Sequence, residues 1–83
     1  MERYLDVRDR QPPEPLELIL AELDELPAQD WLRVRHRRDP VPLYNILREM
    51  GFKWHSCWVA DEIEIVIWHE ANRNFDREKV APC

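Results

Sequence analysis

The sequence contains one glycine, two cysteines and no long apolar run, and each of these shortages excludes a class of protein. With Gly51 as the only glycine in 83 residues, no phosphate-binding glycine-rich loop and no dinucleotide-binding fingerprint can form. Cys57 and Cys83 cannot build a disulfide framework, and their spacing does not resemble a zinc site. No apolar run approaches the roughly 20 residues that span a membrane, and residues 1–6 lack a signal-peptide core. We therefore expect a cytoplasmic protein without membrane association, bound metal or cofactor.

The chain also lacks an excess of positive charge, because its formal net charge is −5. That sign argues against non-specific nucleic-acid binding, so we expect no nucleic-acid partner. The charge is uneven: residues 1–30 carry three basic and nine acidic side chains, whereas residues 31–53 carry six basic and two acidic ones. A basic middle segment favours contact with an acidic patch on a protein partner. The length allows one domain, and 45% hydrophobic residues are too many for a disordered chain.

The pattern of apolar residues predicts the order β-α-β-α-β-β. Alternation predicts strands over residues 4–8 and 31–38, and helical spacing predicts a helix from Pro13 to Pro27 between them. A second helix begins at residue 39 or 41 and ends at Gly51, which can adopt a positive φ. Two further strands, over residues 52–59 and 63–68, form an antiparallel hairpin.

These elements predict an α+β fold, a two-layer α/β sandwich with a four-stranded mixed sheet and two helices on one face. The first two strands flank a helix and are therefore expected to be parallel. The pattern leaves open which face of the third strand is buried. Residues 1–69 form the domain, and residues 70–83 form a polar C-terminal tail, either frayed or a short, loosely packed helix.

Several motifs resemble the TusA/SirA-like superfamily, and most closely its branch of small bacterial domains of unknown function. They are residues 5–8 (LDVR), 12–15 (PPEP), 38–43 (RDPVPL), 51–52 (GF) and the isoleucines of strand 63–68. The resemblance covers about residues 5–68 and implies the same sandwich. The sulfur carriers of that superfamily hold a persulfide on the cysteine of a Cys-Pro-x-Pro motif at the start of the first helix. Pro12 stands at that position here and has no nucleophile, so we expect a protein that is not an enzyme.

Three arginines, Arg33, Arg35 and Arg37, share the outer face of the second strand. One interpretation is a stripe that recognises a protein partner, with Trp68 as an apolar anchor. The alternative is cross-strand ion pairing with carboxylates such as Glu64.

A second candidate is an anion pocket formed by Arg8, Arg10 and the N-terminus of the first helix. Against it stand the prolines, which have no N–H to donate, and Glu14, which brings a negative charge.

Two thiols offer a third candidate. Cys57 shares a strand face with His55, which is able to activate a thiolate, and Cys83 ends the sequence. The simpler interpretations are a half-buried apolar residue and a solvated end, both thiols being free. A metal site would need His36 and His69 as well, and scattered histidines are more often structural.

Together these features favour a small cytoplasmic, non-catalytic interaction or regulatory module that binds a protein partner. A sulfur-relay carrier that uses Cys57 or Cys83 is the first alternative. An accessory protein of anaerobic respiration that binds a metal or redox cofactor, suggested by family analogy, is the second. The oligomeric state is left open.

Overall fold

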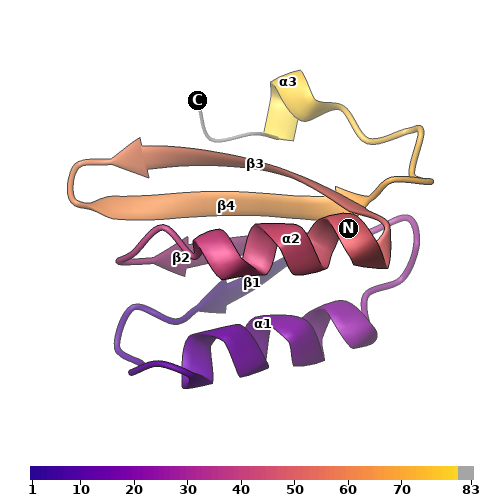
Figure 1. Cartoon of the computed structure of the whole chain (residues 1–83). Helices are drawn as coiled ribbons and strands as arrows, with labels where there is room; N and C mark the ends of the chain where they lie inside the picture. The colour runs from indigo at the N-terminus through magenta and orange to yellow at the C-terminus, as the bar shows by residue number, and fades with distance from the viewer. Residues whose placement is uncertain (81–83) are drawn as a thin grey trace.

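The computed structural model describes residues 1–80 and confirms the predicted fold class. Four strands form one sheet in the order β1-β2-β4-β3, and α1 and α2 cover one of its faces (Figure 1). The elements are β1 (Glu2–Asp6), α1 (Glu14–Asp24), β2 (Trp31–His36), α2 (Val41–Met50), β3 (Phe52–Val59), β4 (Glu62–His69) and α3 (Arg77–Val80).

The pairing of the strands follows the predicted connections. β1 and β2 are parallel, as expected for strands that flank a helix, and β4 is antiparallel to both β2 and β3. The β3–β4 hairpin turns at Ala60, which has a φ of +59°. This order places β2 and β4 in the centre of the sheet and leaves β1 and β3 at its edges.

The core lies between the sheet and the two long helices. Most of its largest fully buried side chains come from α1, α2, β2 and β4, and all of these are aliphatic: Ile19, Leu32, Val34, Leu43, Leu47, Ile63, Ile65 and Ile67. Burying a side chain of this size contributes roughly 1.5–3 kcal/mol. On β3, Phe52 and Trp54 pack against this core, so the opposite face of β3 carries Lys53, His55 and Cys57.

Both long helices begin at the same end of the sheet, where β1 and β2 finish (Figure 1). Proline occupies the first turn of each helix, where a missing N–H costs no internal hydrogen bond. α2 ends at Gly51, whose φ of +84° is left-handed, as predicted. The two helix starts and the two strand ends thus surround one small region.

The first two strands end earlier than the alternation predicts, at Asp6 and His36. In each case the last side chain accepts a hydrogen bond from the backbone two residues later. Asp6 Oδ1 accepts the N–H of Arg8 at 3.0 Å, and His36 Nδ1 accepts the N–H of Arg38 at 3.1 Å. Such local bonds compete with the sheet ladder and turn the chain away from it.

The segment after β4 folds back over the outer face of the sheet, the face that α1 and α2 leave uncovered. Phe75 stacks on Trp68 with ring centroids 4.3 Å apart and meets Trp31 edge-on at 5.5 Å. Of the two alternatives for the C-terminal residues, a short helix, α3, is present over residues 77–80. No helix within residues 1–80 is long and apolar enough to cross a membrane.

Candidate functional site

Arg33, in the middle of the outer face, is held by three groups of the chain itself. Its guanidinium pairs with Glu64 and lies 2.9 Å from Glu2 Oε1. It also donates a hydrogen bond of 2.6 Å to the carbonyl of Val80 in α3. Because its side chain is only 19% exposed, Arg33 has little capacity left for a partner.

Arg35 and Arg8 continue this chain of ion pairs by sharing one carboxylate. Glu62 lies 3.3 Å from Arg35 and 3.0 Å from Arg8. Arg35 also lies 3.3 Å from Glu64, and Arg8 lies 2.7 Å from Asp6. The cross-strand pairing with Glu64, one of the two interpretations of the arginine stripe, is therefore present.

The ion pairs stabilise the ionised form of the outer-face carboxylates. Hydrogen bonds from the side chain and backbone of Arg8 lower the pKa of Asp6 to about 2. A hydrogen bond from Arg33 lowers the pKa of Glu2, against the opposing effect of burial. Both carboxylates are thus charged at neutral pH and cancel the positive charge beside them.

Trp68 points to the outer face, as predicted, but it is not an exposed anchor. Phe75 covers it, and Trp68 is only 8% exposed. Trp58, by contrast, is 51% exposed. Within the predicted stripe, only Arg37 stands apart, with a 64% exposed side chain and Asp9 at 4.0 Å.

Arg37 instead belongs to a cleft at the ends of β1 and β2, together with the predicted anion-pocket residues. The cleft has a volume of about 140 Å³, and we call it the arginine cleft. Its lining includes Arg8, Arg10, Pro12, His36, Arg37 and Arg38. Two candidates that the sequence suggested separately, the arginine stripe and the anion pocket, therefore meet through Arg37.

The arginines of this cleft differ in how far they are neutralised. Arg10 lies 2.8 Å from the carboxylate of Glu14, four residues later in the chain. Arg37 has only the distant Asp9, whose side chain is 94% exposed. The guanidinium of Arg38 makes no ion pair or hydrogen bond within residues 1–80. Two positive charges therefore remain open to a ligand.

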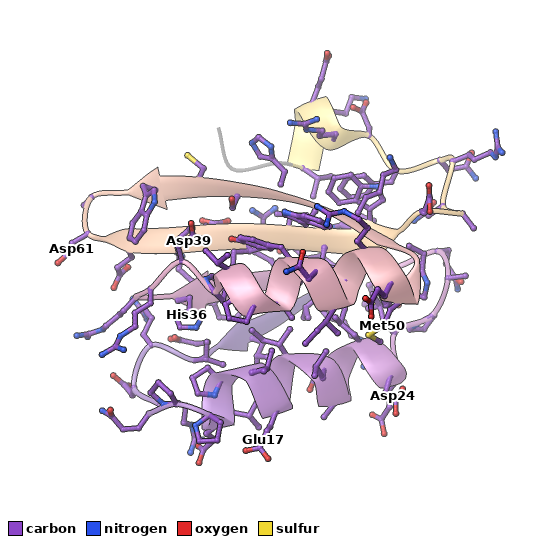
Figure 2. All side chains as sticks on the ribbon, viewed as in Figure 1. Glu17, Asp24, His36, Asp39, Met50 and Asp61 are labelled. Carbon is purple, nitrogen blue, oxygen red and sulfur yellow. The ribbon has the colours of Figure 1, made fainter. Side chains whose placement is uncertain are left out.

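His36 is the buried member of the cleft and is only 8% exposed. Figure 2 shows it near the start of α2, between the two helices. Burial lowers its pKa, the charge of Arg38 adds to this, and Asp39 opposes it. The neutral ring accepts the Arg38 N–H at Nδ1, so its own proton is on Nε2. No residue within 1–80 accepts a hydrogen bond from Nε2.

An apolar hollow of about 380 Å³ adjoins the arginine cleft, between the starts of α1 and α2. We call it the proline groove. Its apolar wall includes Pro12, Pro13, Pro15, Pro40, Pro42 and Leu43. Pro12, His36 and Arg38 line both hollows. The position at which the resemblance would place a carrier thiol is therefore part of their common wall.

Sequence reasoning considered His36 only for a metal site and missed Arg38 as a site residue. Strand alternation placed His36 among core residues, and Arg38 followed the strand without a motif of its own. The available signal was a histidine at the end of an otherwise aliphatic strand face, four residues before the first helix-opening proline, Pro40.

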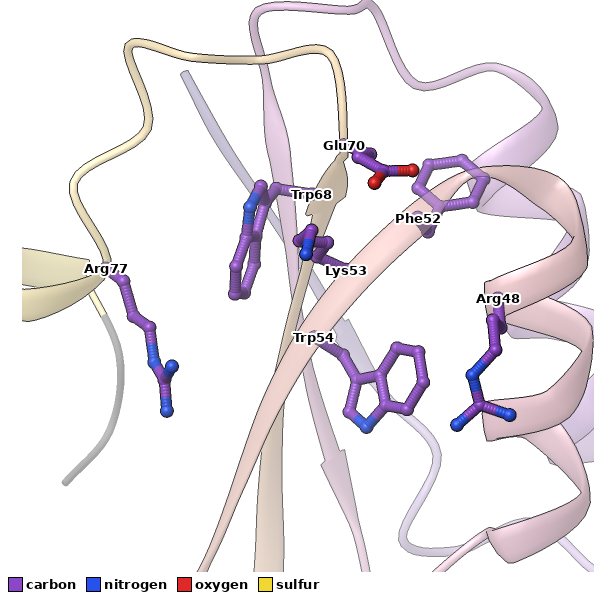
Figure 3. A pocket seen from close by; sticks show the side chains of 7 residues that line it. All are labelled: Arg48, Phe52, Lys53, Trp54, Trp68, Glu70 and Arg77. Carbon is purple, nitrogen blue, oxygen red and sulfur yellow. The ribbon is translucent and has the colours of Figure 1, made fainter.

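A third hollow, of about 310 Å³, lies at the free edge of β3 (Figure 3). Lys53 and Arg77 line its outer side, and Trp54 lies on the side of α2. Trp54 stacks on Tyr44 at 5.2 Å, and Arg48 lies 5.6 Å from its ring. The cationic side chains of this hollow, Arg48, Lys53 and Arg77, are all exposed.

The predicted thiol sites do not form an activated pair. Cys57 is not a free thiol in the part of the chain that the structure describes, which corrects our expectation for it. Its Sγ lies 3.4 Å from the carbonyl of Trp58. His55 contacts Arg77 instead, at 2.6 Å through Nδ1. Cys83 lies outside the described residues.

The three histidines have separate neighbours. His36 bonds the backbone of Arg38, His55 meets Arg77, and His69 lies 2.9 Å from the carbonyl of Leu26. Within residues 1–80, no three side chains of the types that ligate metals come together.

Comparison with known proteins places the chain in a family. No curated protein and no solved structure matches it. One family model, described as an uncharacterized conserved protein (DUF2249), matches residues 4–69, which include the strand ends and helix starts around the arginine cleft. The chain therefore belongs to the DUF2249 family.

Proposed function

We propose that this chain is a non-catalytic interaction module that binds an acidic segment of a protein partner in the arginine cleft. The observation that carries the proposal is the pair of arginines, Arg37 and Arg38, that lack a close carboxylate beside the buried His36. Guanidinium groups form strong, directional hydrogen bonds with carboxylates. Two uncompensated charges of the basic segment 31–53 thus lie in one place.

The motif resemblance extends this proposal. The resemblance of the proline motifs to those of TusA/SirA-like sulfur carriers supports it, because the proposed binding site includes the position where a carrier would hold its thiol. Because Pro12 replaces the nucleophile there, the module binds its partner without transferring a group. The same proposal includes a bacterial origin and a cytoplasmic location for the protein.

The test uses a fluorescein-labelled peptide, Gly-Ser-Glu-Asp-Ser-Glu-Leu, with a free carboxyl terminus, and measures binding by fluorescence anisotropy at low salt. The double variant R37A/R38A should weaken binding about tenfold or more, because each lost charge-assisted contact is worth more than a neutral one. Added salt should weaken binding to the wild type, since the contacts lie near the surface.

The matched control is R73A/K79A, which also removes two positive charges, but from exposed positions after β4. It should bind the peptide as the wild type does. Absence of binding to the wild type, or an equal loss in both double variants, would contradict the proposal.

A further inference from the structure

Two hollows of different chemistry share one wall at the ends of β1 and β2. The arginine cleft offers hydrogen-bond donors, and the larger proline groove offers apolar surface. Pro12, His36 and Arg38 belong to both. A ligand that fills both hollows must therefore place an anion and an apolar group very close together.

The hydrogen-bond donors on the shared wall favour one type of anion. His36, a largely buried residue, lines both hollows, and its Nε2–H has no acceptor within residues 1–80; the neighbouring guanidinium of Arg38 is equally without a partner there. Hydrogen bonds to charged groups contribute more than neutral ones, so an ionised acceptor at this point would be stabilised. A carboxylate fits because its two oxygens accept from both donors at once.

The proline groove is suited to an aliphatic side chain. Proline has no N–H, so the five prolines of this wall present carbon surface and donate no backbone hydrogen bond. Asp39, the acidic residue of this hollow, already accepts a hydrogen bond of 2.6 Å from the hydroxyl of Tyr44. The groove therefore favours an apolar group over a second charged one.

We propose that the segment bound here is the C-terminus of the partner, with its terminal carboxylate on His36 and Arg38 and its last side chain, an apolar one, in the proline groove. In a terminal residue the carboxylate and the side chain leave the same Cα, which matches two hollows with a common wall. An internal acidic residue would have to use the side chain of its neighbour, which in an extended peptide points to the opposite face. This inference rests on the proposed function and specifies its ligand.

The test compares three versions of the peptide Gly-Ser-Glu-Asp-Ser-Glu-Leu on the intact chain: the free acid, the C-terminal amide, and a free acid ending in glycine. The amide should bind about tenfold more weakly than the free acid, because it loses a charge-assisted acceptor. The glycine version should also bind about tenfold more weakly, because it leaves the groove unfilled. Equal affinity of the free acid and the amide would overturn the inference, whereas loss of binding in R37A/R38A alone would still support the proposed function.

Variants of the chain locate the effect. The exposed variant R38A and the buried variant H36F should both reduce the preference for free acid over amide, while R73A/K79A keeps it. Far-ultraviolet circular dichroism shows whether H36F is folded, and R38A provides the answer if it is not. Full displacement of the peptide by an equal concentration of N-acetyl-leucine would indicate a small-molecule site and overturn the assignment to a protein terminus.

Discussion

Arginines from one short stretch of sequence occupy two electrostatic environments. Arg33 and Arg35 lie on β2 opposite the carboxylates of β1 and β4, and all their charge is compensated within the chain. Arg37 and Arg38 come after β2 has ended at His36. The register of β2 with β4 ends there, at His36 and Ile63. The next carboxylate of β4, Glu62, already pairs with Arg8 and Arg35. The end of a strand thus separates arginines that hold the fold together from arginines that remain open to a ligand.

The largest expected change in stability concerns the compensated arginines of the outer face. Replacing Glu64 with Ala leaves Arg33 and Arg35 without their common partner, whose side chain is only 10% exposed. We expect Glu64→Ala to lower the free energy of unfolding by about 2–3 kcal/mol, since it removes charge-assisted hydrogen bonds at a nearly buried position, although Glu2 and Glu62 remain as partners of Arg33 and Arg35. Urea unfolding followed by tryptophan fluorescence measures this change.

The matched variant in the cleft is Arg38→Ala. Because Arg38 is exposed and its guanidinium makes no hydrogen bond or ion pair within residues 1–80, its removal should change the free energy of unfolding by less than about 0.5 kcal/mol. Equal destabilisation by Arg38→Ala and Glu64→Ala would show that the two environments do not differ as described.

The fold followed from the sequence because it rests on local patterns. Alternation and helical spacing gave the order of elements, and the prolines and Gly51 marked the ends of α2 within one or two residues. The parallel pairing of β1 and β2 then followed from the intervening helix. Each of these inferences needs only neighbours in the chain.

The site did not follow because it depends on contacts between distant residues. Alternation shows that Trp68 leaves the core face but not that Phe75 folds back to cover it. Strand periodicity also fails to show where a strand ends, which is decided here by the hydrogen bond between His36 and the backbone of Arg38. That early end removes Arg37 from the outer face and brings it to the cleft.

Lowering the pH should affect the two regions at different pH values. Each loss in the free energy of unfolding should be smaller than that caused by Glu64→Ala. Burial lowers the pKa of His36 below 6.5. Between pH 6.5 and this lowered pKa, the unfolded chain therefore binds a proton at His36 that the folded chain does not bind. Stability therefore falls as pH drops from 6.5 toward the lowered pKa. For Asp6, the folded pKa of about 2 lies below the usual 3.8, so its contribution is lost only between these values.

Urea unfolding at several pH values measures both stages in the wild type and in His36→Gln. The variant should lose the stage below pH 6.5 and keep the one below pH 4, because glutamine does not titrate. A first stage that persists unchanged in His36→Gln would contradict the role assigned to the buried histidine.

The smallest expected effect concerns Arg10, which lies between the two environments because Glu14 holds it in an exposed pair at 2.8 Å. Exposed pairs contribute less than about 1 kcal/mol, so Glu14→Gln should free Arg10 for the cleft at little cost in stability. We expect the free-acid peptide to bind about two- to threefold more tightly, as measured by anisotropy. Glu22→Gln changes the net charge equally but releases Arg3, near the start of β1. An equal gain in both variants would mean that net charge, rather than the position of an arginine beyond the end of its strand, determines binding.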